Sequence, residues 1–146
     1  MNYGKAFKQY KRSNVETAGK LELILMCYDM TMLSLEQAKD HLQNGEIDKK
    51  ALKIQKAIDI ISELQANLNF EKGGEIATGL DSLYMYIIKR VIHADIQKDY
   101  PAFNECIEIL KELKSAWEGI SATQENIPVE DSNTTQNIKR LSQIAA

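Results

Sequence analysis

Residues 21–35, LELILMCYDMTMLSL, limit most strongly what this chain can fold into, because eleven of these fifteen residues are apolar. The exceptions are Glu22, Asp29, Thr31 and Ser34. A helix on the outside of a small protein needs an apolar stripe only about 100° wide. The unbroken apolar run, Leu23 to Tyr28, is too short to cross a bilayer, which takes about 20 residues. The stretch therefore predicts a helix with more apolar surface than one core contact requires.

Two helices are expected in the first half of the chain. The first begins at a cap on Thr17 and ends near Gln43, where Asn44-Gly45 tolerates a left-handed turn. The second begins near Asp48 as cap and ends before EKGG, residues 71–74, which are interpreted as a loop. Its apolar positions follow the spacing of three and four that lays one face along a helix. They are Leu52, Ile54, Ala57, Ile58, Ile61, Leu64 and Leu68.

Two more helices are expected in the second half. The third carries Ile76, Leu80, Leu83, Tyr84, Ile87, Ile88 and Val91, and fades over residues 95–98. Asp99 caps the fourth, and Pro101 is tolerated in its first turn. The stripe of the fourth is Phe103, Ile107, Leu110, Lys114 and Trp117. Four helices with short links, and no segment typical of a strand, predict an all-α fold, an antiparallel up-down four-helix bundle.

Length and composition favour one soluble domain. The chain has 146 residues, and we assign 1–120 to the bundle and 121–146 to a flexible polar tail, whose last residues suggest a short amphipathic helix. A net charge of −3 offers no basic excess for nucleic acid. The first residues have no apolar core of a signal peptide, and Cys27 and Cys106 suit buried thiols in a reducing compartment. We therefore predict a cytoplasmic protein that neither binds nucleic acid nor inserts into a membrane.

No pattern for catalysis or metal binding is found in the sequence. His41 and His93 have no second His or Cys at ligand spacing, and neither cysteine has a CxxC partner. Di-metal helical bundles use Glu-x-x-His, which does not occur here. Gly73-Gly74 belongs to no phosphate-binding pattern. We predict that the protein is not an enzyme and has no cofactor and no metal.

The surplus apolar surface of the first helix forms two bands. One is Leu21, Leu25, Tyr28, Met32 and Leu35, and the other is Leu23, Met26, Met30 and Leu33. The bundle core is expected to account for one band. Either this helix is the most buried of the four, or the second band lines a groove for a partner helix, where methionines adapt to varied surfaces.

A series of motifs in register resembles the flagellin-specific export chaperone family, FliS, over about residues 1–120. The motifs are Phe7-x-x-Tyr10, VETA (15–18), LILMCYD (23–29), IISELQANLNFEKGGEIATGL (60–80), LYMYIIKR (83–90), HADIQKD (93–99) and Trp117. The resemblance implies a four-helix bundle that binds the C-terminal segment of flagellin in the cytoplasm. It also implies that binding prevents premature polymerisation and aids delivery to the flagellar type III export gate, a second candidate partner.

Eight residues are candidates for flagellin binding. Tyr10, Tyr28, Ile76 and Leu83 fall on the family's pattern, and Leu21, Leu25, Met30 and Leu33 come from the bands of the first helix. Without its client the protein is expected to be a monomer or a weak dimer. The alternative is a non-enzymatic helical adaptor or homodimer that uses the apolar face of the first helix.

The tail supplies a testable prediction. We expect Ile138, Leu141 and Ile144 to fold onto the apolar groove when no client is bound, because a tethered segment has a high effective concentration. Deleting residues 125–146 should then tighten flagellin binding, measured by calorimetric titration of both proteins with the same flagellin segment. Unchanged affinity would contradict the expectation.

Overall fold

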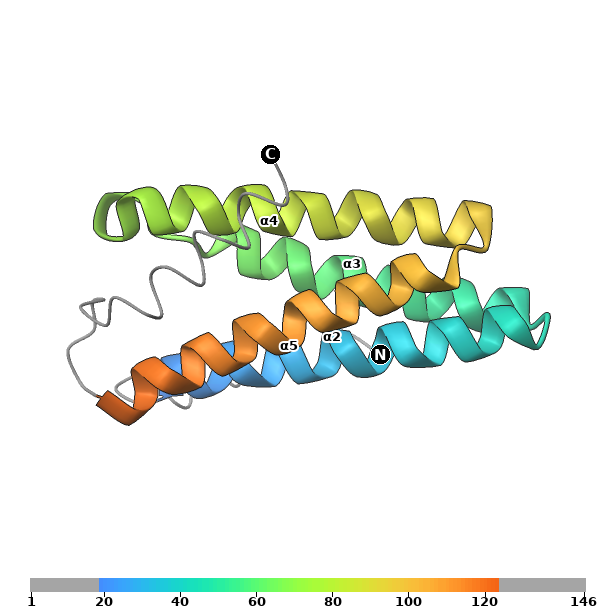
Figure 1. The fold of residues 1–146 in the computed structure, drawn as a ribbon, viewed down its shortest axis with the longest axis horizontal. Helices are drawn as coiled ribbons and strands as arrows, with labels where there is room; N and C mark the ends of the chain where they lie inside the picture. The colour runs from blue at the N-terminus through green and yellow to red at the C-terminus, as the bar shows by residue number, and fades with distance from the viewer. Residues whose placement is uncertain (1–18, 124–146) are drawn as a thin grey trace.

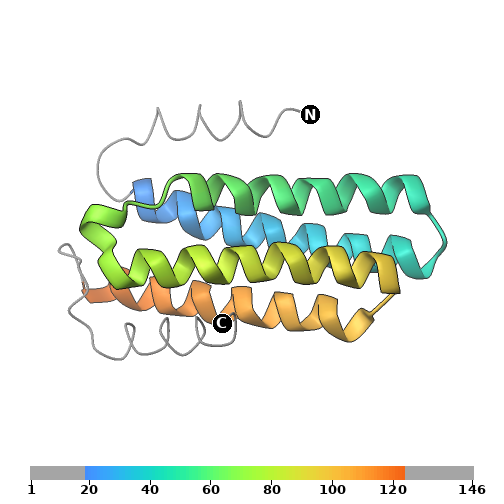
Figure 2. The same ribbon diagram turned by 90° about the horizontal axis from the view of Figure 1, so that it is seen from above.

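The computed structural model describes residues 19–123 as a bundle of four α-helices (Figure 1). They are α2 (Gly19–Gln43), α3 (Ile47–Ala66), α4 (Phe70–Gln97) and α5 (Tyr100–Thr123). Successive helices run antiparallel, and α5 returns beside α2, as the view from above also shows (Figure 2). Each helix packs against two neighbours in the ring α2, α3, α4, α5, most extensively α2 against α3. The predicted all-α antiparallel up-down bundle is confirmed.

One apolar stripe of each helix makes the core. Its largest fully buried side chains are Tyr28, Tyr84, Phe103, Leu35, Ile61, Leu80, Leu83, Ile87, Leu110 and Leu113. Each such Leu or Ile stabilises the fold by about 1.5–3 kcal/mol before its lost conformational entropy is counted. The stripes of α4 and α5 follow the predicted ones, but in α3 Leu52 is 71% exposed and Ile60 is buried. Leu52 lies too far around the helix from Ile54 and Ala57 to reach the core.

Two buried hydroxyls and the indole of the half-buried Trp117 meet in the core. The hydroxyls of Tyr28 and Tyr84 are 2.7 Å apart, and Trp117 Nε1 donates to the Tyr28 hydroxyl oxygen at 2.7 Å. The contact joins α2 to α4, which are diagonal in the ring, and both to α5. Burial raises the pKa of both tyrosines, so their hydroxyls stay neutral.

The link between α2 and α3 follows the predicted left-handed turn but not the predicted cap. Gly45 has a φ of 73°, and Glu46 N donates to His41 O at 2.8 Å. Glu46, and not Asp48, is the residue before the first turn of α3, because its carbonyl already accepts from Lys50 N at 2.9 Å. The carboxylate of Glu46 lies 2.9 Å from His41 Nδ1.

The EKGG segment is part of α4 and not the predicted loop. The Asn69 side chain caps a first turn by accepting from Lys72 N at 3.0 Å, and Asn69 O accepts from Gly73 N at 2.8 Å. Gly74, with φ 49° and ψ −125°, then breaks the helical geometry, and the helix resumes after it. Only glycine adopts such a conformation readily. Residues 71–74 therefore form a kink that separates one turn from the rest of α4.

The helix α3 ends at Ala66, before the predicted Leu68, whereas the link between α4 and α5 agrees with the sequence. Lys98 takes the left-handed conformation after α4, and Asp99 Oδ1 accepts from Ala102 N at 3.1 Å, as a cap does. The helix α5 runs to Thr123. The predicted Thr17 cap, and the tail from residue 124 with its predicted groove contact, lie outside the described residues. Among the described helices, none is long and apolar enough for a transmembrane span.

The contribution of the Tyr28–Tyr84 hydrogen bond to the stability of the bundle can be measured with a variant. Tyr84→Phe should lower the free energy of unfolding by about 1–2 kcal/mol, because the Tyr28 hydroxyl loses a partner where water cannot replace it. Urea denaturation followed by circular dichroism measures the change. Tyr100→Phe is the control, since the described residues give that half-buried tyrosine no side-chain hydrogen bond, and should change stability by less than about 0.5 kcal/mol. Equal effects would contradict the role of the contact.

The kink can be tested by comparing two glycines. Asparagine is tolerated in the left-handed turn after a helix, so Gly45→Asn should alter the free energy of unfolding little. Gly74→Asn should cost about 1–3 kcal/mol, because the φ and ψ of Gly74 lie outside that left-handed region. Thermal and urea unfolding of both variants give the comparison. If Gly74→Asn is as stable as Gly45→Asn, the kink is not fixed by glycine.

Candidate functional site

The buried face of α2 runs between the two apolar bands that the sequence suggests. It consists of Gly19, Leu23, Cys27, Tyr28, Thr31, Ser34, Leu35, Ala38 and Leu42. The core thus takes residues from both bands, and the expectation that it accounts for one whole band is wrong. Thr31 and Ser34, polar in sequence, are fully buried, and Thr31 Oγ1 donates to Cys27 O at 2.8 Å within the helix. That bond lets a small polar side chain face the core.

Each side of this buried face leaves apolar side chains partly uncovered. Leu21, Leu25 and Met32 lie on the side toward α5, where Asp29 Oδ1 is 2.8 Å from Lys114 Nζ and Lys39 Nζ donates to Asn104 Oδ1 at 3.0 Å. Met26, Met30 and Leu33 lie on the opposite side, which borders α3. We call Met26, Met30 and Leu33 the α2 strip. The first helix therefore does carry more apolar surface than the core uses.

The predicted binding residues fall into three groups. Leu33 is 55% exposed, and Leu21, Leu25, Met30 and Ile76 are half-buried. Tyr28 and Leu83 have 0% exposed surface, and Tyr10 lies outside the described residues.

Burial decides which of these residues can meet a partner. Because Tyr28 and Leu83 offer no surface to a second chain, we leave them out of the site proposed below. Leu21 lies in the first turn of α2 and Ile76 near the start of α4, and both helices begin at the same end of the bundle (Figure 2). The structure thus places Leu21 and Ile76 at one end, and Met30 and Leu33 further along α2.

A second apolar surface, which the sequence did not lead us to predict, lies on α4. Met85, Ile92 and Ile96 are 41%, 42% and 70% exposed. With the half-buried Ile88 they recur at intervals of three, four and four, which is one face of a helix displaced from the buried stripe. The spacing was a signal that could have been found, because the buried stripe already accounts for the core contact of α4.

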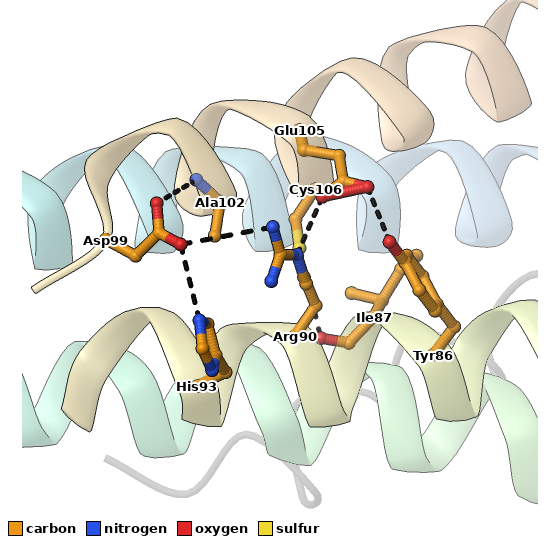
Figure 3. Close-up of polar contacts among 8 residues, drawn as sticks. All are labelled: Tyr86, Ile87, Arg90, His93, Asp99, Ala102, Glu105 and Cys106. Atoms are coloured by element: carbon orange, nitrogen blue, oxygen red, sulfur yellow. Dashed lines mark hydrogen bonds and ion pairs between the residues drawn. The ribbon is translucent and has the colours of Figure 1, made fainter. Parts of the chain in front are cut away.

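A polar cluster ties α4 to α5 (Figure 3). Glu105 accepts from the Tyr86 hydroxyl at 2.5 Å and from Arg90 Nε at 2.7 Å. Burial alone would raise the pKa of Glu105, but these two hydrogen bonds outweigh it and lower the pKa. His93 Nε2 lies 3.3 Å from Asp99 Oδ2, the carboxylate that also caps α5. Arg90 thus lies between two carboxylates, 2.7 Å from Glu105 Oε1 and 3.9 Å from Asp99 Oδ2, and the cluster joins the two helices.

Neither cysteine is placed for chemistry. Cys27 and Cys106 are free and buried, and burial raises the pKa of each thiol to about 12, so little thiolate exists at neutral pH. Within residues 19–123, no group of three or more His, Cys, Asp or Glu side chains gathers where it could hold a metal ion. The chemistry available to the described surface is apolar contact along α2 and α4.

Known proteins are similar in sequence to this chain over most of its length. A family model described as flagellar protein FliS matches residues 3–124. The flagellar secretion chaperone FliSB of Pseudomonas aeruginosa is 37% identical over 121 residues, which cover 80% of this chain and 96% of that protein. FliS of Salmonella typhimurium is 39% identical over 119 residues, 80% of this chain and 88% of that protein. The flagellar secretion chaperone FliS of Vibrio cholerae is 32% identical over 126 residues, which cover 84% of this chain and 93% of that protein.

These matches confirm the resemblance that the sequence motifs indicate, and they extend over all four described helices. The relatives are named as chaperones, which agrees with a bundle whose surface offers apolar contact. The chain belongs to the FliS family of flagellar secretion chaperones.

Proposed function

We propose that this chain is a cytoplasmic export chaperone that binds the C-terminal segment of flagellin. Binding would prevent premature polymerisation and aid delivery to the flagellar type III export apparatus. The observation that carries the proposal is the surplus apolar surface of α2, above all Leu33 and Met30 of the α2 strip. The names of the relatives supply the process, secretion of flagellar proteins.

The physical reason is the cost of ordering a client. A segment that is disordered when free loses conformational entropy on binding, and burial of apolar surface must offset that loss. The α2 strip offers such surface, with two methionines whose flexible thioethers adapt to varied side chains. We also include Leu21 and Leu25, on the side of α2 toward α5, and Ile76 near the start of α4 in the proposed site.

The proposed role needs binding and no catalysis. The two thiols are buried, and the polar side chains between α4 and α5 hydrogen-bond to each other and join the two helices. A cytoplasmic location follows from the proposed client, since flagellin must be bound before it is exported. The export gate is proposed as a second partner of the loaded chaperone.

The α2 strip can be tested by titration with a peptide of the C-terminal flagellin segment. Leu33→Asp and Met30→Asp should each weaken binding about tenfold or more, because a charge in an apolar contact must be desolvated without a partner. Isothermal titration calorimetry measures the affinities, and circular dichroism checks that the variants keep their helices.

Leu52→Asp is the matched control. Leu52 is a leucine that is 71% exposed and lies on α3, outside the α2 strip, so this variant should bind flagellin like the unchanged chain. If Leu33→Asp and Leu52→Asp bind equally well, the α2 strip is not the flagellin site. If Leu33→Asp removes self-association and leaves flagellin binding intact, the α2 strip serves an adaptor or homodimer instead.

A further inference from the structure

One polar side chain continues the apolar row of α2. Met26, Met30, Leu33 and Gln37 follow one another at intervals of four, three and four, so they lie along one side of the helix. Gln37 is half-buried and takes the place after Leu33, toward the end of α2 that leads into α3. A segment bound along the α2 strip therefore reaches Gln37 where the apolar side chains end.

The carbonyl oxygen of Gln37 has no hydrogen-bond donor. Its Oε1 is shielded from solvent, and no group in the part of the chain that the structure describes donates a hydrogen bond to it. Shielded polar atoms are almost always paired, because an acceptor without a donor raises the free energy of the folded protein. An unpaired acceptor at the end of a proposed binding surface points to a donor on the bound chain.

Two other shielded side-chain oxygens of residues 19–123 lack a hydrogen bond, and both differ from that of Gln37. Ser34 has no exposed surface, so a second chain cannot reach its hydroxyl. Asp95 Oδ1 lies 2.7 Å from Lys50 Nζ and so has an ionic partner. Of the three, Gln37 is the one that is half-buried, unpaired and next to the α2 strip.

The side chain of Gln37 is also free to turn. Two of its polar neighbours on α2 are held within the protein, since Lys39 donates to Asn104 Oδ1 at 3.0 Å and His41 Nδ1 lies 2.9 Å from Glu46 Oε1. No hydrogen bond holds the carbonyl oxygen of Gln37 in its inward orientation. A change of rotamer can therefore turn this oxygen toward a bound segment without breaking a hydrogen bond.

A single polar group in an apolar contact has a known use. Apolar side chains supply affinity, but a bound helix or strand can slide along them with little loss. A polar group that must be paired fixes the register, as one Asn does in the core of a coiled coil. The α2 strip is apolar over Met26, Met30 and Leu33, and Gln37 is the polar group at its end.

We propose that Gln37 fixes the register of the bound flagellin segment by accepting a hydrogen bond from it. The donor is an N–H group that the secondary structure of the segment leaves free, as in the first turn of a helix. The inference rests on the proposed function, because it names a contact of the same site.

Gln37→Met tests the hydrogen bond, because the two possible roles of Gln37 predict opposite results. Methionine removes the acceptor and lengthens the apolar strip. If Gln37 accepts from the segment, the affinity for a peptide of the C-terminal flagellin segment, measured by isothermal titration calorimetry, falls about threefold to tenfold. An affinity that is unchanged or higher overturns the proposal.

The unbound chain gives a second readout. Because Gln37→Met removes a shielded acceptor that has no donor, the melting temperature without peptide should rise by about 2–4 °C. A variant that is more stable and yet binds more weakly does not owe its lost affinity to a damaged fold. A melting temperature that does not rise overturns the proposal, since the acceptor would then be paired in the unbound chain.

The register itself can be observed by nuclear magnetic resonance. A nitroxide label at one end of the peptide should broaden the amide signals of one short stretch of the unchanged chain. In Gln37→Met the broadening should spread over neighbouring turns of α2, because the segment slides. Broadening confined to the same stretch in both proteins would show that Gln37 does not set the register.

Gln43→Met is the matched control. Gln43 is exposed in the last turn of α2 and lies off the row of the α2 strip, so this variant should change neither the affinity nor the melting temperature. If Leu33→Asp weakens binding and Gln37→Met does not, the present inference fails and the proposed function stands. If the unchanged chain does not bind the peptide, both fail.

Discussion

The hydrogen bonds among Tyr28, Tyr84 and Trp117 are the constraint on which the bundle depends. The two tyrosine hydroxyls are buried where water cannot replace a lost partner, and the indole of the half-buried Trp117 donates to Tyr28 from α5. Because the three side chains come from α2, α4 and α5, the helices can satisfy them only at one rotation and one height. Apolar packing alone would tolerate small sliding of one helix along another. The polar contact removes that freedom, including across the diagonal of α2 and α4.

The rotation of α2 set by this contact decides what is left outside. With Tyr28 turned inward, Thr31 and Ser34 also face the core, and Met30 and Leu33 face away from it. The surplus apolar surface is therefore the consequence of a fixed core and not of loose packing. The proposed binding of a client segment would use this surface without opening the core.

The two sides of α4 are held differently. Toward α5, the helix makes charged hydrogen bonds through Arg90, Tyr86 and Glu105. Toward α3, polar contacts occur at Asp81 and Asp95, and the residues between them are apolar. The α5 side is closed by satisfied charges, whereas the α3 side leaves isoleucines uncovered.

The sequence by itself determined the all-α class, the number and order of the helices, the turn at Gly45 and the cap at Asp99, because these depend on local spacing and on residues close in the chain. It also determined the family, through motifs in register. Only the tertiary structure decided that Tyr28 and Leu83 are buried, that Leu52 is exposed and that Gly74 kinks a helix. Helical spacing shows which residues share a face, but which face a neighbour covers depends on contacts between distant parts of the chain. Those contacts, which no local pattern contains, divided the seven candidate residues that the structure describes.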